Sequence, residues 1–141
     1  MEEFRTGLLY CVDCLDVMKR LPDEQIDLIY IDPPFHSNRN YEVVFGDLQE
    51  IRRFRDRMEG GLDVYVTWLM DRIDKMHRLL KPTGSIYIHL DWHIVHYVKI
   101  KMDEVFGYGN FQNEVIWYYS VGGKSSKRWA RKHDNILFYT K

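Results

Sequence analysis

The chain has 141 residues, of which 45% are hydrophobic and 15% aromatic, and its formal net charge is −1. This length limits it to one domain, and the composition is that of a folded globular protein rather than a disordered one. No apolar run is long enough to span a bilayer, and the acidic start (Met1, Glu2, Glu3) is unlike a secretory signal. The sequence therefore predicts a globular cytoplasmic domain without a membrane-spanning segment.

The first half of the chain predicts two strands and a short helix. Residues 8–12 are a short apolar run, typical of a strand, and residues 15–21 are typical of a helix. Residues 26–31 are nearly all β-formers, as expected of a strand buried on both faces. Residues 35–61 are polar with clustered charges, and predict a mobile excursion with one helical turn at most.

The second half predicts helices and strands in alternation. Apolar residues recur at threes and fours between Leu62 and Leu80, which predicts an amphipathic helix ended by Pro82 and Gly84. A strand over 84–90 and a helix over 95–105, closed by Gly107, should follow. Strands over 115–119 and 136–140 have no helix between them and should pair antiparallel. This order predicts an α/β fold: a mostly parallel sheet with helices on both faces and a C-terminal antiparallel strand pair.

The sharpest chemical signal is the turn Asp32-Pro33-Pro34-Phe35, directly after the strand over 26–31. In open α/β sheets, ligands bind at the carboxyl ends of the strands. The prolines fix the backbone and have no N–H, so their carbonyls can point outward as acceptors. A carboxylate, a carbonyl and an aromatic ring in one turn suit an amino group on a flat ring. The alternative is a plain turn that ends a strand, because Asp-Pro commonly opens turns.

Such a turn has a definite use in amino-group chemistry. The lone pair of an exocyclic amine is delocalised into the ring, so the amine is a poor nucleophile. Acceptors for its hydrogens draw the nitrogen toward tetrahedral geometry and aim the lone pair at a methyl donor. Catalysis would then come from positioning and from stabilising the charge that develops on nitrogen.

Two other features carry weaker signals. Cys11 and Cys14 have CxxC spacing, but no second pair completes a zinc site, so we expect small apolar residues at a strand end and no metal. A run of basic residues without an acidic one is suited to phosphates, although a solvated loop is the alternative. Its members are Lys124, Lys127, Arg128, Arg131 and Lys132.

The motif order resembles a known family. The D-P-P-[YF] turn is flanked upstream by Val12-Asp13-Cys14-Leu15 and downstream by Lys81-Pro82-Thr83-Gly84-Ser85 and His133-Asp134-Asn135-Ile136-Leu137. This pattern resembles the DNA methyltransferases that methylate the N6 of adenine or the N4 of cytosine. Within them it is similar to the permuted group that includes type III modification subunits, in which the catalytic motifs come first.

The resemblance implies a partial Rossmann-like methyltransferase fold, S-adenosylmethionine as methyl donor and a flipped base of double-stranded DNA as acceptor. It places Asp32, Pro33, Pro34 and Phe35 at the base, and Asp13 near the cofactor together with Asp32. His89 and Asp91, which end the strand over 84–90, are expected to contact the cofactor, or else the base; the alternative is that they are polar residues satisfied at a strand end. The expected DNA contacts are Asn38, Tyr41, Lys124, Lys127, Arg128, Arg131 and His133. Val12 stands where the family usually has Gly, which leaves the local backbone conformation open.

Two parts of the family pattern are not found in residues 1–141. Phe106-Gly107-Tyr108-Gly109 follows a helix rather than a strand, so it does not serve as the Gly-rich cofactor loop, and no target-recognition region is found. We therefore expect residues 1–141 to be the catalytic part of a methyltransferase domain that a C-terminal half or a second chain completes. A restriction subunit is a further expected partner.

Three alternatives stay open at this point. The Asp-first motif favours adenine over cytosine, but the permuted group includes both. RNA adenine is a second possible acceptor. The third alternative is a non-catalytic DNA-binding or assembly module derived from such an enzyme.

Overall fold

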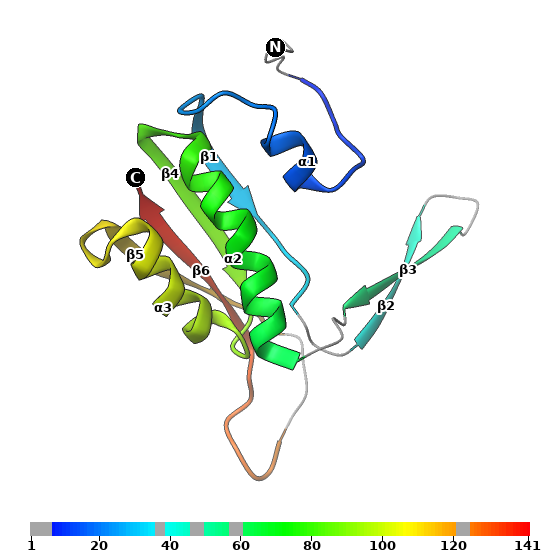
Figure 1. Cartoon of the computed structure of the whole chain (residues 1–141). Coiled ribbons are helices and arrows are strands. Elements are labelled where there is room, and N and C mark those ends of the chain that lie inside the picture. Colours follow the sequence, from blue (N-terminus) through cyan, green and yellow to red (C-terminus); the bar gives the residue numbers. More distant parts are fainter. Residues whose placement is uncertain (1–6, 36–38, 46–49, 57–60, 121–124) are drawn as a thin grey trace.

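The computed structural model describes residues 7–35, 39–45, 50–56, 61–120 and 125–141 of the chain (Figure 1). No helix within these ranges is long and apolar enough to cross a membrane. The elements are α1 (Cys14–Met18), β1 (Ile26–Ile31), β2 (Arg39–Phe45), β3 (Glu50–Asp56), α2 (Gly61–Leu79), β4 (Leu80–Leu90), α3 (Val95–Phe106), the 3₁₀ turn η1 (Tyr108–Asn110), β5 (Phe111–Tyr118) and β6 (His133–Thr140).

Four strands form one sheet in the order β1-β4-β6-β5. β1 and β4 run parallel, with Ile31 opposite Ile88, whereas β6 is antiparallel to both β4 and β5. The predicted C-terminal antiparallel pair is thus confirmed, but the described sheet is mixed rather than mostly parallel. The reason is that β6 returns from β5 without a crossover helix and inserts beside β4.

α2 and α3 contact each other and lie side by side over one face of this sheet (Figure 1). β4 shows the asymmetry: Ile86, Ile88 and Leu90 have no exposed surface, whereas Tyr87 and His89, on the opposite face, are partly exposed. Burial of each such apolar side chain contributes about 1.5–3 kcal/mol. The prediction of helices on both faces is therefore not met by the described helices.

β1 has the predicted bounds, but it is only partly buried and on one side, where Ile26, Ile29 and Ile31 pack against the core. Leu28 and Tyr30 are 58% and 52% exposed, because β1 is the edge strand of the described sheet and no described helix covers their face. The continuous apolar run predicted burial on both faces, which is wrong for the described residues.

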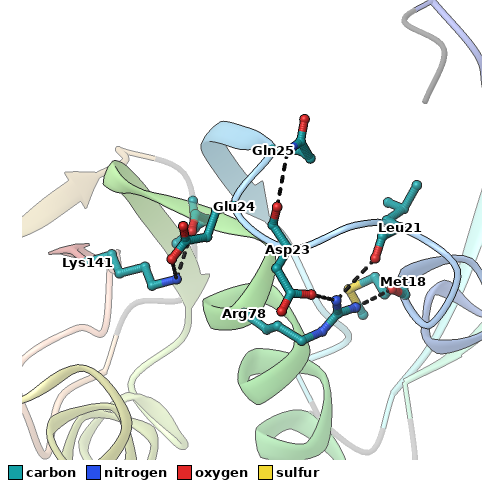
Figure 2. A network of polar contacts seen from close by, with 8 residues as sticks. Met18, Leu21, Asp23, Glu24, Gln25, Arg78 and Lys141 are labelled. Carbon is teal, nitrogen blue, oxygen red and sulfur yellow. Dashed lines mark hydrogen bonds and ion pairs between the residues drawn. The ribbon is translucent and has the colours of Figure 1, made fainter. Parts of the chain in front are cut away.

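Arg78, near the end of α2, fixes the segment between α1 and β1 (Figure 2). Its guanidinium donates to the carbonyl oxygens of Met18 at 2.6 Å and Leu21 at 3.1 Å, and it forms an ion pair with Asp23. Two of these acceptors are backbone carbonyls, so the contacts hold the chain path itself. They tie the segment between α1 and β1 to the end of α2.

Residues 8–12 are not the strand that their apolar character predicted. No described strand pairs with them, and Leu9 is 99% exposed. An apolar run becomes a strand only where a neighbouring backbone satisfies its hydrogen bonds. Cys11 and Cys14 are therefore exposed free cysteines rather than buried residues at a strand end.

Residues 39–56 contain an antiparallel hairpin, formed by β2 and β3, where the sequence predicted an irregular excursion. Tyr41 pairs with Phe54, and Val44 with Ile51. This correction has a simple cause. Two antiparallel strands that are close in sequence pair their backbones locally, so they need no apolar run of the kind that marks a core strand.

Candidate functional site

The turn Asp32–Phe35 lies at the carboxyl end of β1, as predicted. The parallel register that places Ile31 opposite Ile88 brings the next residues, Asp32 and His89, beside each other. The Asp32 side chain is 60% exposed, so the carboxylate stands at the rim of the sheet and not in the core. It is available to a ligand.

His89 lies at the centre of a cluster on the sheet face that the helices leave open. Its Nδ1 is 3.2 Å from Oδ1 of Asp32, and its Nε2 is 3.5 Å from Oδ2 of Asp134. The ring meets Phe35 edge-on at 5.1 Å between centroids and stacks on Trp117 at 6.0 Å. β1, β4, β5 and β6 therefore converge on one imidazole.

A cleft of about 500 Å³ opens beside β1, on the other side of Asp32. The segment around Asp13, the turn at Asp32 and Pro33, and the side chains of Trp68 and Arg72 from α2 line it. Its volume is within the range of small-molecule and cofactor sites. An indole and two carboxylates match the ring and the hydrogen-bond donors of a nucleoside.

Asp13 both caps α1 and pairs with a buried arginine. Its Oδ1 accepts the Leu15 amide at 2.9 Å, and its Oδ2 accepts from Arg72 at 2.8 Å. The Leu15 amide lowers the pKa of Asp13 most; desolvation opposes this, and the Arg72 charge adds to the lowering. The Arg72 guanidinium also lies 4.0 Å from the centroid of Trp68. Asp13 is thus a fixed carboxylate in the cleft wall.

Asp91 lies at the same sheet edge but forms a local turn. Its two carboxylate oxygens contact the backbone N and the ring Nδ1 of His93, at 2.9 and 2.6 Å, and only 8% of the residue is exposed. Its predicted contact with a cofactor stays a prediction. The structure does not bring Asp91 into the His89 cluster.

The basic segment is tied to this edge at its end. The Arg131 guanidinium lies 3.4 Å from the centroid of Trp92, the residue after Asp91. Lys132 Nζ donates to the Ser120 carbonyl at 2.9 Å, and the Lys132 carbonyl accepts the Tyr119 amide. Lys127 and Arg128 are exposed in the same segment, and His133 begins β6 opposite Tyr118.

Three of the predicted DNA contacts have side chains that the structure leaves out. Asn38 and Lys124 lie outside the described residues. For Tyr41 only the backbone position in β2 is described.

The sequence pattern missed Arg72, Trp117 and Asp134. Arg72 carried a usable signal, because it falls on the apolar face of α2 beside Leu69 and Ile73, where a charge needs a partner. Asp134 falls within the motif His133–Leu137 and Trp117 on a predicted strand, but nothing in the sequence marked either as a residue of the site. Their place beside His89 follows from the pairing of β5 with β6, which a linear pattern does not specify.

Comparisons with known proteins place this geometry in a family. The model of the DNA methylase family (N6_N4_Mtase) matches residues 26–141. The chain is 26% identical over 133 residues to the type II methyltransferase M.HpaI of Haemophilus parainfluenzae, covering 94% of this chain and 38% of that protein. It is 31% identical over 144 residues to the Mod subunit of the type III restriction-modification enzyme StyLTI of Salmonella typhimurium, covering 88% and 21%. The chain thus spans less than two-fifths of the length of these relatives.

Solved structures share the fold. The cytosine-N4-specific PvuII DNA methyltransferase superimposes with a TM-score of 0.63 at 16% identity, covering 93% of this chain and 48% of that one. The M1.HpyAVI–SAM complex gives a TM-score of 0.56 at 15% identity, covering 94% and 53%. The predicted Rossmann-like methyltransferase fold is thereby confirmed. Since the family model also matches most of its residues, the chain belongs to the DNA methylase family.

Proposed function

We propose that the chain is the catalytic part of an S-adenosylmethionine-dependent DNA methyltransferase that methylates the exocyclic amino group of a flipped base, adenine N6 in the first instance. The observation that carries this proposal is the position of Asp32. Its exposed carboxylate stands between the cleft beside β1 and the aromatic cluster around His89. In methyl transfer, the donor in the cleft and the base beside the aromatic cluster would approach the Asp32 carboxylate from opposite sides.

The acceptor side is formed by the turn. The Asp32 carboxylate and a proline carbonyl of the same turn would accept the two amine hydrogens, and Phe35 would lie against the base. These contacts localise the lone pair of the amine on its nitrogen and orient it. Because the groups are already in place, the protein reorganises little as charge develops.

The donor side is the cleft. S-adenosylmethionine, when bound, supplies a methyl group on a sulfonium centre. Trp68 offers an aromatic surface, and Asp13, held by Leu15 and Arg72, offers acceptor lone pairs to an adenine amino group or ribose hydroxyls. One solved neighbour of the same fold is itself a SAM complex. The residues of the cleft therefore fit this cofactor, and Asp32 is one of the residues that line it.

The partner would be duplex DNA. The basic segment 125–132 lies on the edge that carries Trp92 and Asp91, so its cations can meet phosphates while the base enters beside Asp32. A second chain or C-terminal half would supply the remaining fold. The Mod relative supports a restriction subunit as a further partner, since it belongs to a restriction-modification enzyme.

We favour adenine as the methylated base because the motif begins with Asp32. The PvuII methyltransferase, which shares the fold, is cytosine-N4-specific. RNA methylation and a non-catalytic DNA-binding role are the competing outcomes. Chromatography and mass spectrometry of hydrolysed nucleic acids separate them, because N6-methyladenine, N4-methylcytosine and modified RNA nucleosides are distinct products.

The decisive test removes the carboxylate. The native locus with its flanking sequence is expressed in a host that lacks DNA methylation, and methylated bases are counted in genomic DNA. Asp32→Asn and Asp32→Ala are expected to lower methylation by about 100-fold or more, because they remove an acceptor aimed at the amine. Asp27→Asn is the matched control, since Asp27 is an exposed carboxylate of β1 that pairs with Lys81. Unchanged methylation in both Asp32 variants would contradict the enzyme and favour the binding module.

A further inference from the structure

We propose that His89 is a positioning residue that fixes the Asp32 carboxylate and the Phe35 ring for the acceptor base, while Asp134 steadies the far side of the imidazole. The inference deepens the proposed function and depends on it. No catalytic role is assigned to His89 itself: its side chain is 15% exposed and is not among the residues that line the cleft beside β1, so its predicted contact with the cofactor is no part of this inference.

The contrast in exposure is the first argument. The Asp32 side chain is 60% exposed and that of His89 only 15%. A carboxylate on an exposed turn has several rotamers open to it. Nδ1 of His89 lies 3.2 Å from Oδ1 of Asp32, and the His89 ring is almost buried. Because this ring cannot move with the carboxylate, it restricts the rotamers that Asp32 can adopt.

Packing around the ring is the second argument. Phe35 meets it edge-on and Trp117 lies nearly parallel to it, at an interplanar angle of 14°. These contacts leave the imidazole plane little freedom to rotate. His89 thus joins the acid and the aromatic ring of the same turn to one rigid strand.

Nε2 gives the third argument. It is buried, and among the described residues it has no hydrogen-bond partner of good geometry; the nearest carboxylate oxygen is Oδ2 of Asp134, at 3.5 Å. Asp134 is itself held by Tyr119, whose hydroxyl donates to Oδ1 at 3.4 Å. The two ring nitrogens thus each have a carboxylate within 3.5 Å, Asp32 beside Nδ1 and Asp134 beside Nε2, and a group beside the second nitrogen is the usual means of orienting an imidazole.

A second histidine–aspartate pair at the same edge shows what a merely local contact looks like. His93 and Asp91 are two residues apart, and the His93 side chain is 46% exposed. That pair closes a turn. His89 instead contacts three segments besides its own strand: the turn after β1, β5 and β6. None of these segments needs the contact in order to form.

The test uses the different reach of two amides. In His89→Asn the side-chain amide takes the place of Nδ1 and stays beside Asp32; in His89→Gln it takes the place of Nε2 and lies beside Asp134 instead. We expect kcat for methyl transfer to fall by about 10- to 100-fold in His89→Gln, and by less than about threefold in His89→Asn. KM for S-adenosylmethionine should change little in either. His96→Asn is the matched control, because His96 is exposed on α3.

A spectroscopic arm keeps this inference separate from the proposed function. In the 141-residue chain, Asp32→Asn should move the ring ¹⁵N resonances of His89, and Asp27→Asn should not. If Asp32→Asn abolishes methylation but His89→Gln retains full kcat, the positioning role is wrong and the enzyme stands. If Asp32→Asn moves the His89 resonances yet leaves methylation intact, the contact is real and the proposed function fails. An unmoved His89 ring would overturn the inference directly.

Discussion

Gly84 lies in β4 where the backbone of β1 leaves little room for a side chain. A Cβ added there would lie 3.0 Å from the carbonyl oxygens of Ile26 and Lys81 and from a methyl carbon of Leu80. The two oxygens belong to the backbone and cannot move without disturbing the pairing of β1 with β4. Gly84→Ala is therefore expected to lower the free energy of unfolding by about 1–3 kcal/mol, measured by urea denaturation.

Gly109→Ala provides the comparison for this experiment. Nothing lies within 4 Å of a Cβ built at Gly109, so the same methyl group there meets open space. Its unfolding midpoint should stay near that of the parent. Equal effects of the two substitutions would show that the approach of β4 to β1 tolerates a methyl group.

At the residue scale, the part of the site that is local in sequence could be predicted. Asp32 and Phe35 belong to one turn after one strand, so the motif itself places them together. His89 followed as the end of the neighbouring strand. Asp134 and Trp117 join the cluster only because β6 inserts between β4 and β5. That insertion is a tertiary choice, which strand propensity does not encode.

At the element scale, the helices were the most predictable features. α2 covers Gly61–Leu79 and α3 covers Val95–Phe106, close to the ranges that the spacing of apolar residues indicated. Gly107 ends α3 with a φ of 84°, a conformation that favours glycine. One helix face packs on the core, so periodicity records a real physical constraint.

Strand partners were predicted less well than strand positions. β1 and β6 lie near their expected ranges, but β4 begins earlier, at Leu80, and the hairpin of β2 and β3 was missed. Apolar patterns report burial, whereas pairing also depends on which backbone lies alongside. Residues 8–12 show the converse case: they are apolar, but they form no strand because no described strand lies alongside them.

The basic segment 125–132 leads to a prediction about DNA binding. Lys127 and Arg128 are exposed there, and so is Trp129, at 96%. Replacing both cations by Gln is expected to lower affinity for duplex DNA and to reduce the slope of log K against log salt by about 2, since each phosphate contact releases a counterion. Fluorescence anisotropy at a series of salt concentrations measures both quantities.

A charge-matched control separates a specific contact from general attraction. Lys19→Gln with Lys101→Gln removes the same charge from the end of α1 and from α3, where the two lysines pair with Asp16 and Glu104. This double variant should keep most of the salt slope. If both double variants lost the same DNA affinity and the same salt slope, the effect would come from net charge rather than from contacts of the basic segment.

Across the whole molecule, the described sheet is covered by helices on one side and holds its functional cluster on the other. α2 and α3 pack the core against β4 and lie over one face of the sheet (Figure 1). The open face carries His89, Tyr87 and Phe138, and the last two rings are stacked with their centroids 4.4 Å apart. The stability of the core and the chemistry of the rim are thereby separated. Substitutions at the rim can change function without unfolding the protein.

The stability of the whole molecule should nevertheless depend on pH through a residue far from the proposed chemistry. Burial lowers the pKa of His77 below its usual 6.5, and the charge of Lys141 adds to this, while Asp74 opposes it. The folded ring is thus harder to protonate than the unfolded one. The contribution of the neutral His77 ring to the free energy of unfolding is therefore fully present above pH 6.5, and it is lost as the pH falls through the folded pKa of His77.

Urea unfolding at pH 7.5 and pH 5.0 checks this linkage. The parent chain should lose free energy of unfolding between the two values, and His77→Gln should lose less, because Gln carries no proton to take up. His96→Gln should lose as much as the parent, since His96 is exposed. The His77 ring packs edge-on against Phe106 at 4.7 Å, so His77→Gln also removes a contact and lowers stability at both pH values. The informative quantity is therefore the difference between the two pH values, and an unchanged difference in His77→Gln would show that His77 is not the titrating group.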